Sequence, residues 1–219
     1  MTIDQVIRKI QEVGIVPVVR AAHATHAAQA VDAVQAGGIP VVEITMTVPD
    51  AIPLIRQLVK QYGDRVLIGA GTVLNAEQAH ACLDAGAEFL VSPGLSIGVL
   101  EAAKQRAQLA IPGALTPTEI MSASSHGARL IKVFPCGNLG GAKYLKALRG
   151  PFPGLCLIPT GGVNASNAAE FIAAGAFALG VGSELLDGVA LREGRIDKIT
   201  AAAIELVAAV QSARSAAKS

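Results

Sequence analysis

Aromatic residues are scarce in this chain of 219 residues: they make up 3% of it, and tryptophan is absent. Hydrophobic residues make up 52%, so a core has to be built mainly from Ala, Val, Leu and Ile, which suits helices packed on a parallel sheet. Only 16% of the residues are charged, and the net charge is +1. No overall electrostatic field therefore favours nucleic acid or an anionic membrane as a partner.

Cysteine is also rare, and no metal-binding or disulfide pattern is present. Cys82, Cys136 and Cys156 lie far apart without a CxxC motif, and the four histidines lack ligand spacing. We therefore expect a reducing compartment, no structural disulfide, no metal and no other cofactor. The N-terminal segment carries acids among its apolar residues, and no apolar run is long and pure enough to span a bilayer. These features predict a cytoplasmic protein.

Short β-branched runs alternate with Ala-rich stretches from end to end of the chain. Eight runs start roughly 20–26 residues apart, the size of one βα unit, and most are continuously apolar, as expected of parallel strands covered by helices on both faces. The runs are Ile15–Arg20, Pro40–Thr45, Val66–Gly71, Phe89–Ser92, Leu109–Pro112, Leu130–Phe134, Leu155–Thr160 and Ala176–Val181.

The segments between the runs have helix signals. Asn75 and Thr116 are expected N-caps, and Gly37-Gly38, Gly86 and Gly175 fall where helices should stop. An additional helix over residues 3–13 precedes the first strand and is expected to cover the bottom of a barrel. Uniform spacing and the lack of a GxGxxG turn after the first strand favour a closed (β/α)₈ (TIM) barrel over an open doubly wound sheet. We predict that residues 1–219 form a single α/β domain of this type.

Active sites of such barrels lie at the carboxyl ends of the strands, so the polar residues there are the candidates. One lysine stands out: of eight in the chain, only Lys132 lies inside an apolar strand, between Ile131 and Val133. Burial disfavours the ammonium form, and the neutral amine is the nucleophile that Schiff-base formation requires. The structural alternative is a lysine that reaches out of the barrel rim or pairs with a glutamate. The direction of the side chain depends on strand register, which the sequence leaves open.

The first two predicted strands each carry a further charged residue. Glu43 lies within the apolar run VVEIT, where a carboxylate is costly unless it is paired or used as a general acid/base. Its structural alternative is an ion pair with Arg20 or Lys132. Arg20 ends the first strand, where its guanidinium is either solvated or able to bind a carboxylate in bidentate fashion.

Glycine-rich turns follow the last two strands. Thr160-Gly161-Gly162 and Gly182-Ser183 offer exposed backbone N–H groups. In barrels, the turns after strands seven and eight are the recurrent phosphate site. Together the two turns predict a phosphorylated substrate.

In order along the chain, VPVVR, VEITMTVPDA, IGAGTVL, FLVSPG, IPGALTPTEI, LIKVFP, GPFPGLCLIPTGGV and GVGSEL resemble the 2-keto-3-deoxy-6-phosphogluconate / 4-hydroxy-2-oxoglutarate aldolases. The resemblance implies a class I lyase that uses neither metal nor cofactor. Its substrate would be a small phosphorylated 2-keto acid, cleaved to pyruvate and glyceraldehyde 3-phosphate. It also implies a homotrimer.

The resemblance also implies roles for individual residues. Lys132 would form the Schiff base and Glu43 would act as acid/base. The other expected contacts are Arg20 with the substrate carboxylate, Thr72 and the Ser92-Pro93 turn beside it, Phe134 against the bound substrate, and Thr160, Gly161, Gly162 and Ser183 at the phosphate end.

One position departs from part of the family. Some members carry an arginine a few residues after the glutamate, where this chain has Thr47, and Arg20 is then the expected replacement, as in the branch with TVPDA. The substrate remains open between the phosphogluconate, its galactonate epimer and 4-hydroxy-2-oxoglutarate. A phosphate-binding barrel isomerase or epimerase and a catalytically silent metabolite-binding barrel are more distant alternatives.

Overall fold

The structure, a computed structural model, describes residues 1–217. Each of the eight apolar runs contains a parallel strand, so the predicted alternation of strands and helices is confirmed. The strands among these residues are β1 (Ile15–Val19), β2 (Val41–Thr45), β3 (Leu67–Gly71), β4 (Phe89–Val91), β5 (Leu109–Ile111), β6 (Gly113–Ala114), β7 (Leu130–Val133), β8 (Cys156–Pro159) and β9 (Leu179–Val181).

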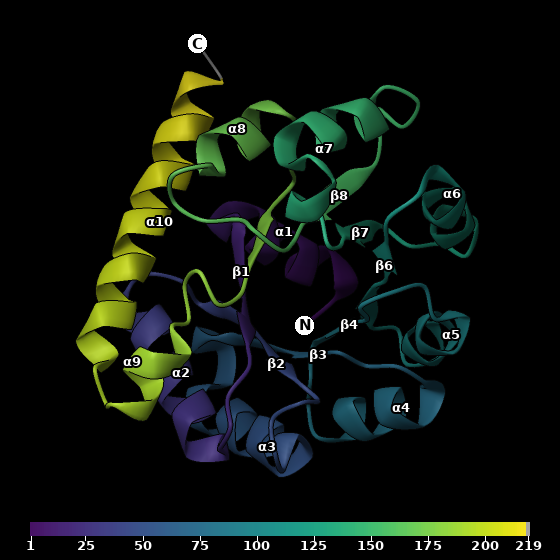
Figure 1. The fold of residues 1–219 in the computed structure, drawn as a ribbon. Coiled ribbons are helices and arrows are strands. Elements are labelled where there is room, and N and C mark those ends of the chain that lie inside the picture. The colour runs from purple at the N-terminus through teal and green to yellow at the C-terminus, as the bar shows by residue number, and fades with distance from the viewer. Residues whose placement is uncertain (218–219) are drawn as a thin grey trace.

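The strands curl around a common centre, as Figure 1 shows, but they do not form one unbroken ladder. One sheet has the order β5-β4-β3-β2-β1-β9 and the other β6-β7-β8. The fifth predicted strand is split because Pro112 lies between β5 and β6 and has no N–H to donate. Between β8 and β9 there is a single parallel bridge, Thr160 with Gly180. The predicted closed ring is thus found as a curled parallel sheet that is interrupted at these two places.

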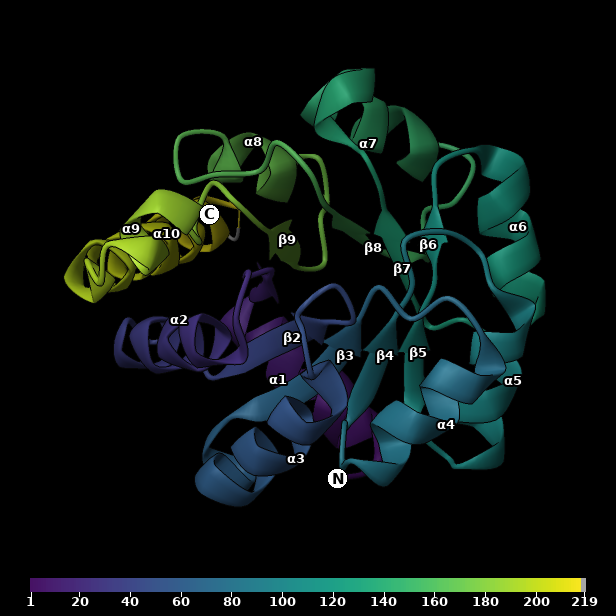
Figure 2. The ribbon, with the colours of Figure 1, turned by 60° about the horizontal axis from the view of Figure 1, so that its bottom comes forward.

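Helices surround the strands (Figures 1 and 2), and the expected caps are present. The side chains of Asn75 and Thr116 accept hydrogen bonds from the N–H groups of Gln78 and Glu119, respectively. Gly38, Gly86 and Gly175 have positive φ angles where helices end. The α-helices are α1 (Ile3–Val13), α2 (Ala24–Ala36), α3 (Ala51–Tyr62), α4 (Ala76–Asp84), α5 (Ile97–Gln105), α6 (Pro117–Ser125), α7 (Gly141–Arg149), α8 (Ala168–Ala173), α9 (Gly188–Arg192) and α10 (Ile196–Ala216), with 3₁₀ turns η1 (Gly63–Arg65) and η2 (Gly137–Leu139).

Two groups of buried apolar side chains follow from the alternation along the strands. The larger lies between strands and outer helices and includes Ile131 and Val133 of β7. The smaller fills the space enclosed by the strands and includes Leu130, together with Val6 and Ile10 of α1. Helix α1 therefore covers the bottom of the enclosed core, as predicted. Full burial of Val6 and Ile10 contributes about 1.5–3 kcal/mol each to folding.

Within residues 1–217, no helix is both long and apolar enough to cross a membrane.

Candidate active site

Lys132 lies in the middle of β7, and its side chain faces the interior. In register it pairs with Gly113 of β6 and Ile158 of β8, and its backbone N–H donates to the carbonyl of Pro112 at 2.9 Å. Since Ile131 and Val133 face the outer helices, the alternation along β7 directs Lys132 to the opposite side. The side chain is 6% exposed, so it does not reach out of the rim.

Glu43 occupies the corresponding interior position on β2. It pairs in register with Val18 of β1 and Gly69 of β3, and its side chain is 3% exposed. Gly71, two residues beyond Gly69, leaves room for the carboxylate: a Cβ at that position would lie 2.6 Å from Oε1 of Glu43. Packing against the Glu43 carboxylate therefore explains why residue 71 is a glycine.

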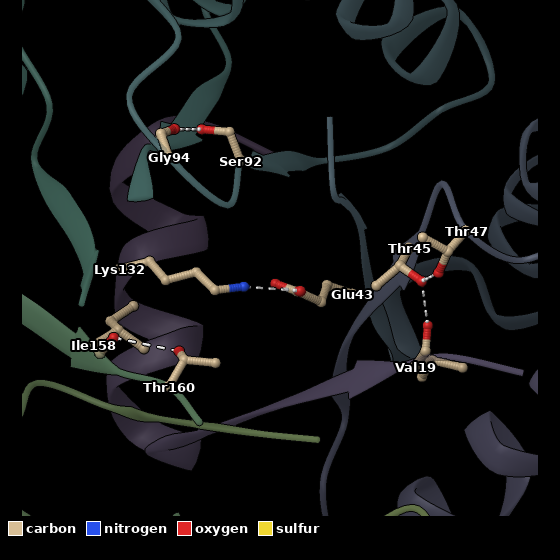
Figure 3. A network of polar contacts seen from close by, with 9 residues as sticks. All are labelled: Val19, Glu43, Thr45, Thr47, Ser92, Gly94, Lys132, Ile158 and Thr160. Carbon is tan, nitrogen blue, oxygen red and sulfur yellow. Dashed lines mark hydrogen bonds and ion pairs between the residues drawn. The ribbon is translucent and has the colours of Figure 1, made fainter. Parts of the chain in front are cut away.

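Lys132 and Glu43 extend toward one another across the enclosed space, as Figure 3 shows. Nζ of Lys132 lies 3.4 Å from Oε1 of Glu43, a buried ion pair. The two alternatives for Glu43, an ion pair and a general acid/base, are therefore compatible, because the carboxylate pairs with the lysine whose proton it would move. A small approach of the two side chains, or one intervening water, brings this separation within range of proton transfer.

A small cavity of about 10 Å³, the room of roughly one water molecule, lies beside this pair. Its walls are mostly apolar, and its polar contributors are Lys132, Glu43 and Thr160. The ring of Phe134 lies next to it, with its centroid 5.5 Å from Nζ of Lys132, in cation–π range. The structure thus brings together four of the residues that the sequence singled out.

The two predicted contacts on β3 and β4 lie just beyond the strand ends. Thr72 follows β3 in the left-handed region, with φ 57°, and is half-buried. Ser92 follows β4, and its hydroxyl donates to the carbonyl of Gly94 at 2.7 Å, which holds the turn that contains Pro93. The backbone of Pro93 packs directly on Gly113, where a Cβ would come within 2.3 Å of it.

The glycine turns after β8 and β9 adopt open conformations. Gly161 and Gly162 both have positive φ, 89° and 72°, which side-chain-bearing residues rarely adopt. Within residues 1–217, the backbone N–H groups of Gly162 and Ser183 donate no hydrogen bond. The hydroxyl of Ser183 donates to Oε2 of Glu184 at 3.3 Å. The two turns therefore present free donors of the kind that bind phosphate.

Arg20 lies apart from the cavity, in a hollow that also contains Thr47 and Arg192. Sequence reasoning did not single out Arg192, because nothing in the local sequence of α9 signals that it meets the end of β1. It also missed Thr45, which is fully buried. Its hydroxyl donates to the carbonyl of Val19 at 2.9 Å and contacts Oγ1 of Thr47 at 2.7 Å (Figure 3). Its position in an apolar strand was the available signal.

The described part of the chain contains no group of three or more His, Cys, Asp or Glu residues that could hold a metal ion. All three cysteines are free: Cys82 and Cys136 are buried, and Cys156 is half-buried.

A comparison of the sequence with protein families identifies the family of this chain. The model of the KDPG and KHG aldolases matches residues 6–202. The chain belongs to this family. The curated 2-dehydro-3-deoxy-phosphogluconate aldolase of Dickeya dadantii is 39% identical over 173 residues, 79% of this chain and 81% of that protein. The 2-dehydro-3-deoxy-6-phosphogalactonate aldolase of Escherichia coli is 37% identical over 149 residues, 68% and 72% of the two chains.

A solved structure of the family aligns over most of the chain. It is the KDPG aldolase of Legionella pneumophila, with pyruvate captured as a covalent carbinolamine, at a TM-score of 0.85 and 32% identity. The alignment covers 91% of this chain and 97% of that one. Membership of this family makes the protein an aldolase, and the expected family resemblance is confirmed.

Proposed function

We propose that this aldolase reversibly cleaves 2-keto-3-deoxy-6-phosphogluconate to pyruvate and glyceraldehyde 3-phosphate through a Schiff base on Lys132. The observation that carries the proposal is the buried pair of Lys132 and Glu43, with 3.4 Å between Nζ and Oε1. The carbinolamine captured in the Legionella pneumophila enzyme supports covalent chemistry of this kind.

The first half of the reaction forms the iminium. Glu43 takes a proton from the Lys132 ammonium, and the free amine attacks the C2 ketone to give a carbinolamine. Glu43 then returns a proton to the C2 hydroxyl, which leaves as water. The apolar walls around Nζ limit competing hydrolysis by keeping bulk water away.

The second half breaks the carbon–carbon bond. Glu43, again a carboxylate, takes the proton of the C4 hydroxyl as the C3–C4 bond breaks. The bonding electrons move into a C2–C3 double bond, and the iminium nitrogen accepts the electron pair, giving an enamine. The aldehyde departs as glyceraldehyde 3-phosphate. Protonation at C3 and hydrolysis of the iminium then release pyruvate and regenerate Lys132.

The remaining roles are assigned by position. Thr72 and the Ser92-Pro93 turn, at the ends of β3 and β4, are proposed to contact the keto-acid end, and Phe134 to pack on it. Thr160, Gly161, Gly162 and Ser183 are proposed to contact the phosphate end, with Gly162 and Ser183 offering N–H donors. Arg20 supplies positive charge for an anionic end of the substrate.

Trapping with borohydride tests the Schiff base. Borohydride with pyruvate should leave a covalent adduct on Lys132, located by peptide mass spectrometry. Lys132→Met should lose the adduct, whereas Lys146→Met, which alters an exposed lysine of α7, should keep it. Absence of an adduct in the wild type, or its persistence in Lys132→Met, would refute the assignment.

The choice of substrate needs a separate measurement, because relatives named for the gluconate and galactonate compounds are similarly close at 39% and 37% identity. The two compounds differ at the C4 hydroxyl, so discrimination depends on hydrogen bonds to that group. We expect the larger kcat/KM for the gluconate epimer. A larger value for the galactonate epimer, or for 4-hydroxy-2-oxoglutarate, would replace the proposed substrate by that compound.

We also propose a homotrimer, as the resemblance implies. Leu74 and Met121 are 55% and 61% exposed, and large apolar side chains of this kind are suited to subunit contacts. Light scattering coupled to gel filtration should give about three times the chain mass of 22.3 kDa. A mass of one or two chains would contradict the proposal.

A further inference from the structure

A second hollow lies beside the proposed active site and is larger than the cavity at Lys132. Its volume is about 280 Å³. Arg20 after β1, Thr47 after β2 and Arg192 at the end of α9 line it, with His26 of α2. Figure 1 shows α9 beside α2 at the edge of the molecule, so residues from distant parts of the chain meet here.

The hollow carries unbalanced positive charge. Within the described residues, the guanidinium groups of Arg20 and Arg192 take part in no hydrogen bond or ion pair, and no carboxylate lines the hollow. Within the described residues, the side chain of His26 forms no hydrogen bond or ion pair, and its ring lies edge-on to that of His23, at 5.3 Å between centroids. By contrast, Arg195 on the same short stretch pairs with Glu193 at 2.6 Å. Two unpaired guanidiniums that face one space suit an oxyanion.

The hydroxyl of Thr47 cannot donate a hydrogen bond to an anion in the hollow. The single hydroxyl proton of Thr45 goes to the carbonyl of Val19, so in the contact between the two threonines Thr47 is the donor. Its own proton is therefore used, and Thr47 has none left for an anion. Arg20 and Arg192 are the cationic donors in the hollow.

The position of Arg20 favours phosphate over carboxylate as the anion. Nη1 of Arg20 lies 3.6 Å from where a Cβ on Gly182 would be, and Gly182 directly precedes Ser183 with its free N–H. The guanidinium of Arg20 therefore lies next to the glycine turn that follows β9. A phosphate dianion also matches two guanidiniums in charge, whereas a carboxylate carries one negative charge.

We propose that Arg192, together with Arg20, binds the phosphate of the substrate, so that α9 helps to select phosphorylated over unphosphorylated keto acids. This inference rests on the proposed function and specifies one part of it: the resemblance implies that Arg20 binds the carboxylate, whereas the position of its guanidinium beside Gly182 favours the phosphate end.

Two substrates with and without phosphate test the inference. Arg192→Gln should lower kcat/KM for the phosphorylated keto acid by about 10- to 100-fold, the range for loss of a charge-assisted hydrogen bond. The unphosphorylated analogue and the pyruvate concentration for half-maximal borohydride trapping should change less than about twofold. Arg195→Gln is the matched control, because this neighbouring arginine already has a partner, and it should resemble the wild type.

Each other outcome overturns the inference. An equal loss for both substrates would make Arg192 structural, and weaker pyruvate trapping would move the hollow to the carboxylate end. No change would remove Arg192 from substrate binding. Calorimetric titration with inorganic phosphate separates this inference from the proposed function. If the wild type bound phosphate and Arg192→Gln bound it more weakly, the anion site would stand, even if the wild type had no aldolase activity. The lack of activity would then refute only the proposed reaction.

Discussion

Nζ of Lys132 lies 3.4 Å from Oε1 of Glu43, although the two residues are 89 positions apart in the chain. Both side chains are almost completely buried, so each is the main compensation for the charge of the other. Removal of one partner from a buried pair leaves an uncompensated charge, whereas removal of both does not.

The pair should therefore be strongly coupled in stability. Glu43→Gln is expected to lower the free energy of unfolding by about 3 kcal/mol, because Lys132 then loses its charged partner. The double variant Glu43→Gln/Lys132→Met should lose less than the sum of the two single variants. Urea denaturation of the four proteins measures this coupling, and strictly additive losses would contradict it.

Gly71 should be needed for the position of the Glu43 carboxylate. In Gly71→Ala the new Cβ would lie 2.6 Å from Oε1, so the carboxylate has to move. Overpacking of this kind costs about 1–3 kcal/mol, and a shift of about 1 Å in a catalytic group lowers the rate by about 100-fold. Steady-state kcat and urea denaturation test both effects.

Gly154→Ala is the matched control for Gly71→Ala, because nothing lies within 4 Å of a Cβ at Gly154. It should leave kcat and stability unchanged. If Gly71→Ala also kept the wild-type kcat, the carboxylate would not depend on this glycine for its position.

The stability of the N-terminal end of α9 should depend on pH through Asp187. Its Oδ1 accepts hydrogen bonds from the N–H groups of Val189 and Ala190, and its Oδ2 accepts one from Lys198 at 2.8 Å. The bond from Lys198, followed by those from the backbone, lowers the pKa of the carboxyl from 3.8 to about 2. A depressed pKa means that this stabilisation is complete above about pH 4 and is lost as pH falls through about 2.

The comparison of wild type with Asp187→Asn measures the effect. The difference in urea midpoint between them should be largest above about pH 4 and should shrink toward pH 2. A difference that stays constant over this window would show that the carboxylate charge does not hold the N-terminal end of α9.

The three thiols should react in a fixed order. Burial raises the pKa of Cys82 to about 12 and that of Cys136 to about 11, and it also raises the pKa of the less buried Cys156. The thiolate is the reactive form, so at about pH 8 a disulfide reagent should react first with Cys156 and very slowly with the other two. Cys156→Ser should abolish the faster phase. A fast reaction at Cys82 or Cys136 would contradict the burial of these thiols.

The sequence by itself determined the order of strands and helices and the chemical types at the strand ends. Short apolar runs such as the one that contains Lys132, and local caps such as Thr116 with Glu119, depend on neighbouring residues, so they can be predicted from the sequence. For the same reason, the family resemblance could be recognised from ordered motifs.

The tertiary structure decided the direction and distance of these groups. Lys132 faces inward because β7 pairs in one register with its neighbours, and a shift of one residue would have turned the lysine outward. The split at Pro112 and the single bridge of Thr160 with Gly180 likewise depend on strand pairing. Arg20 and Arg192 line one hollow because the segments that carry them, the end of β1 and α9, lie on the same side of the fold. Local sequence carries no signal for such contacts, since they arise from the packing of segments far apart in the chain.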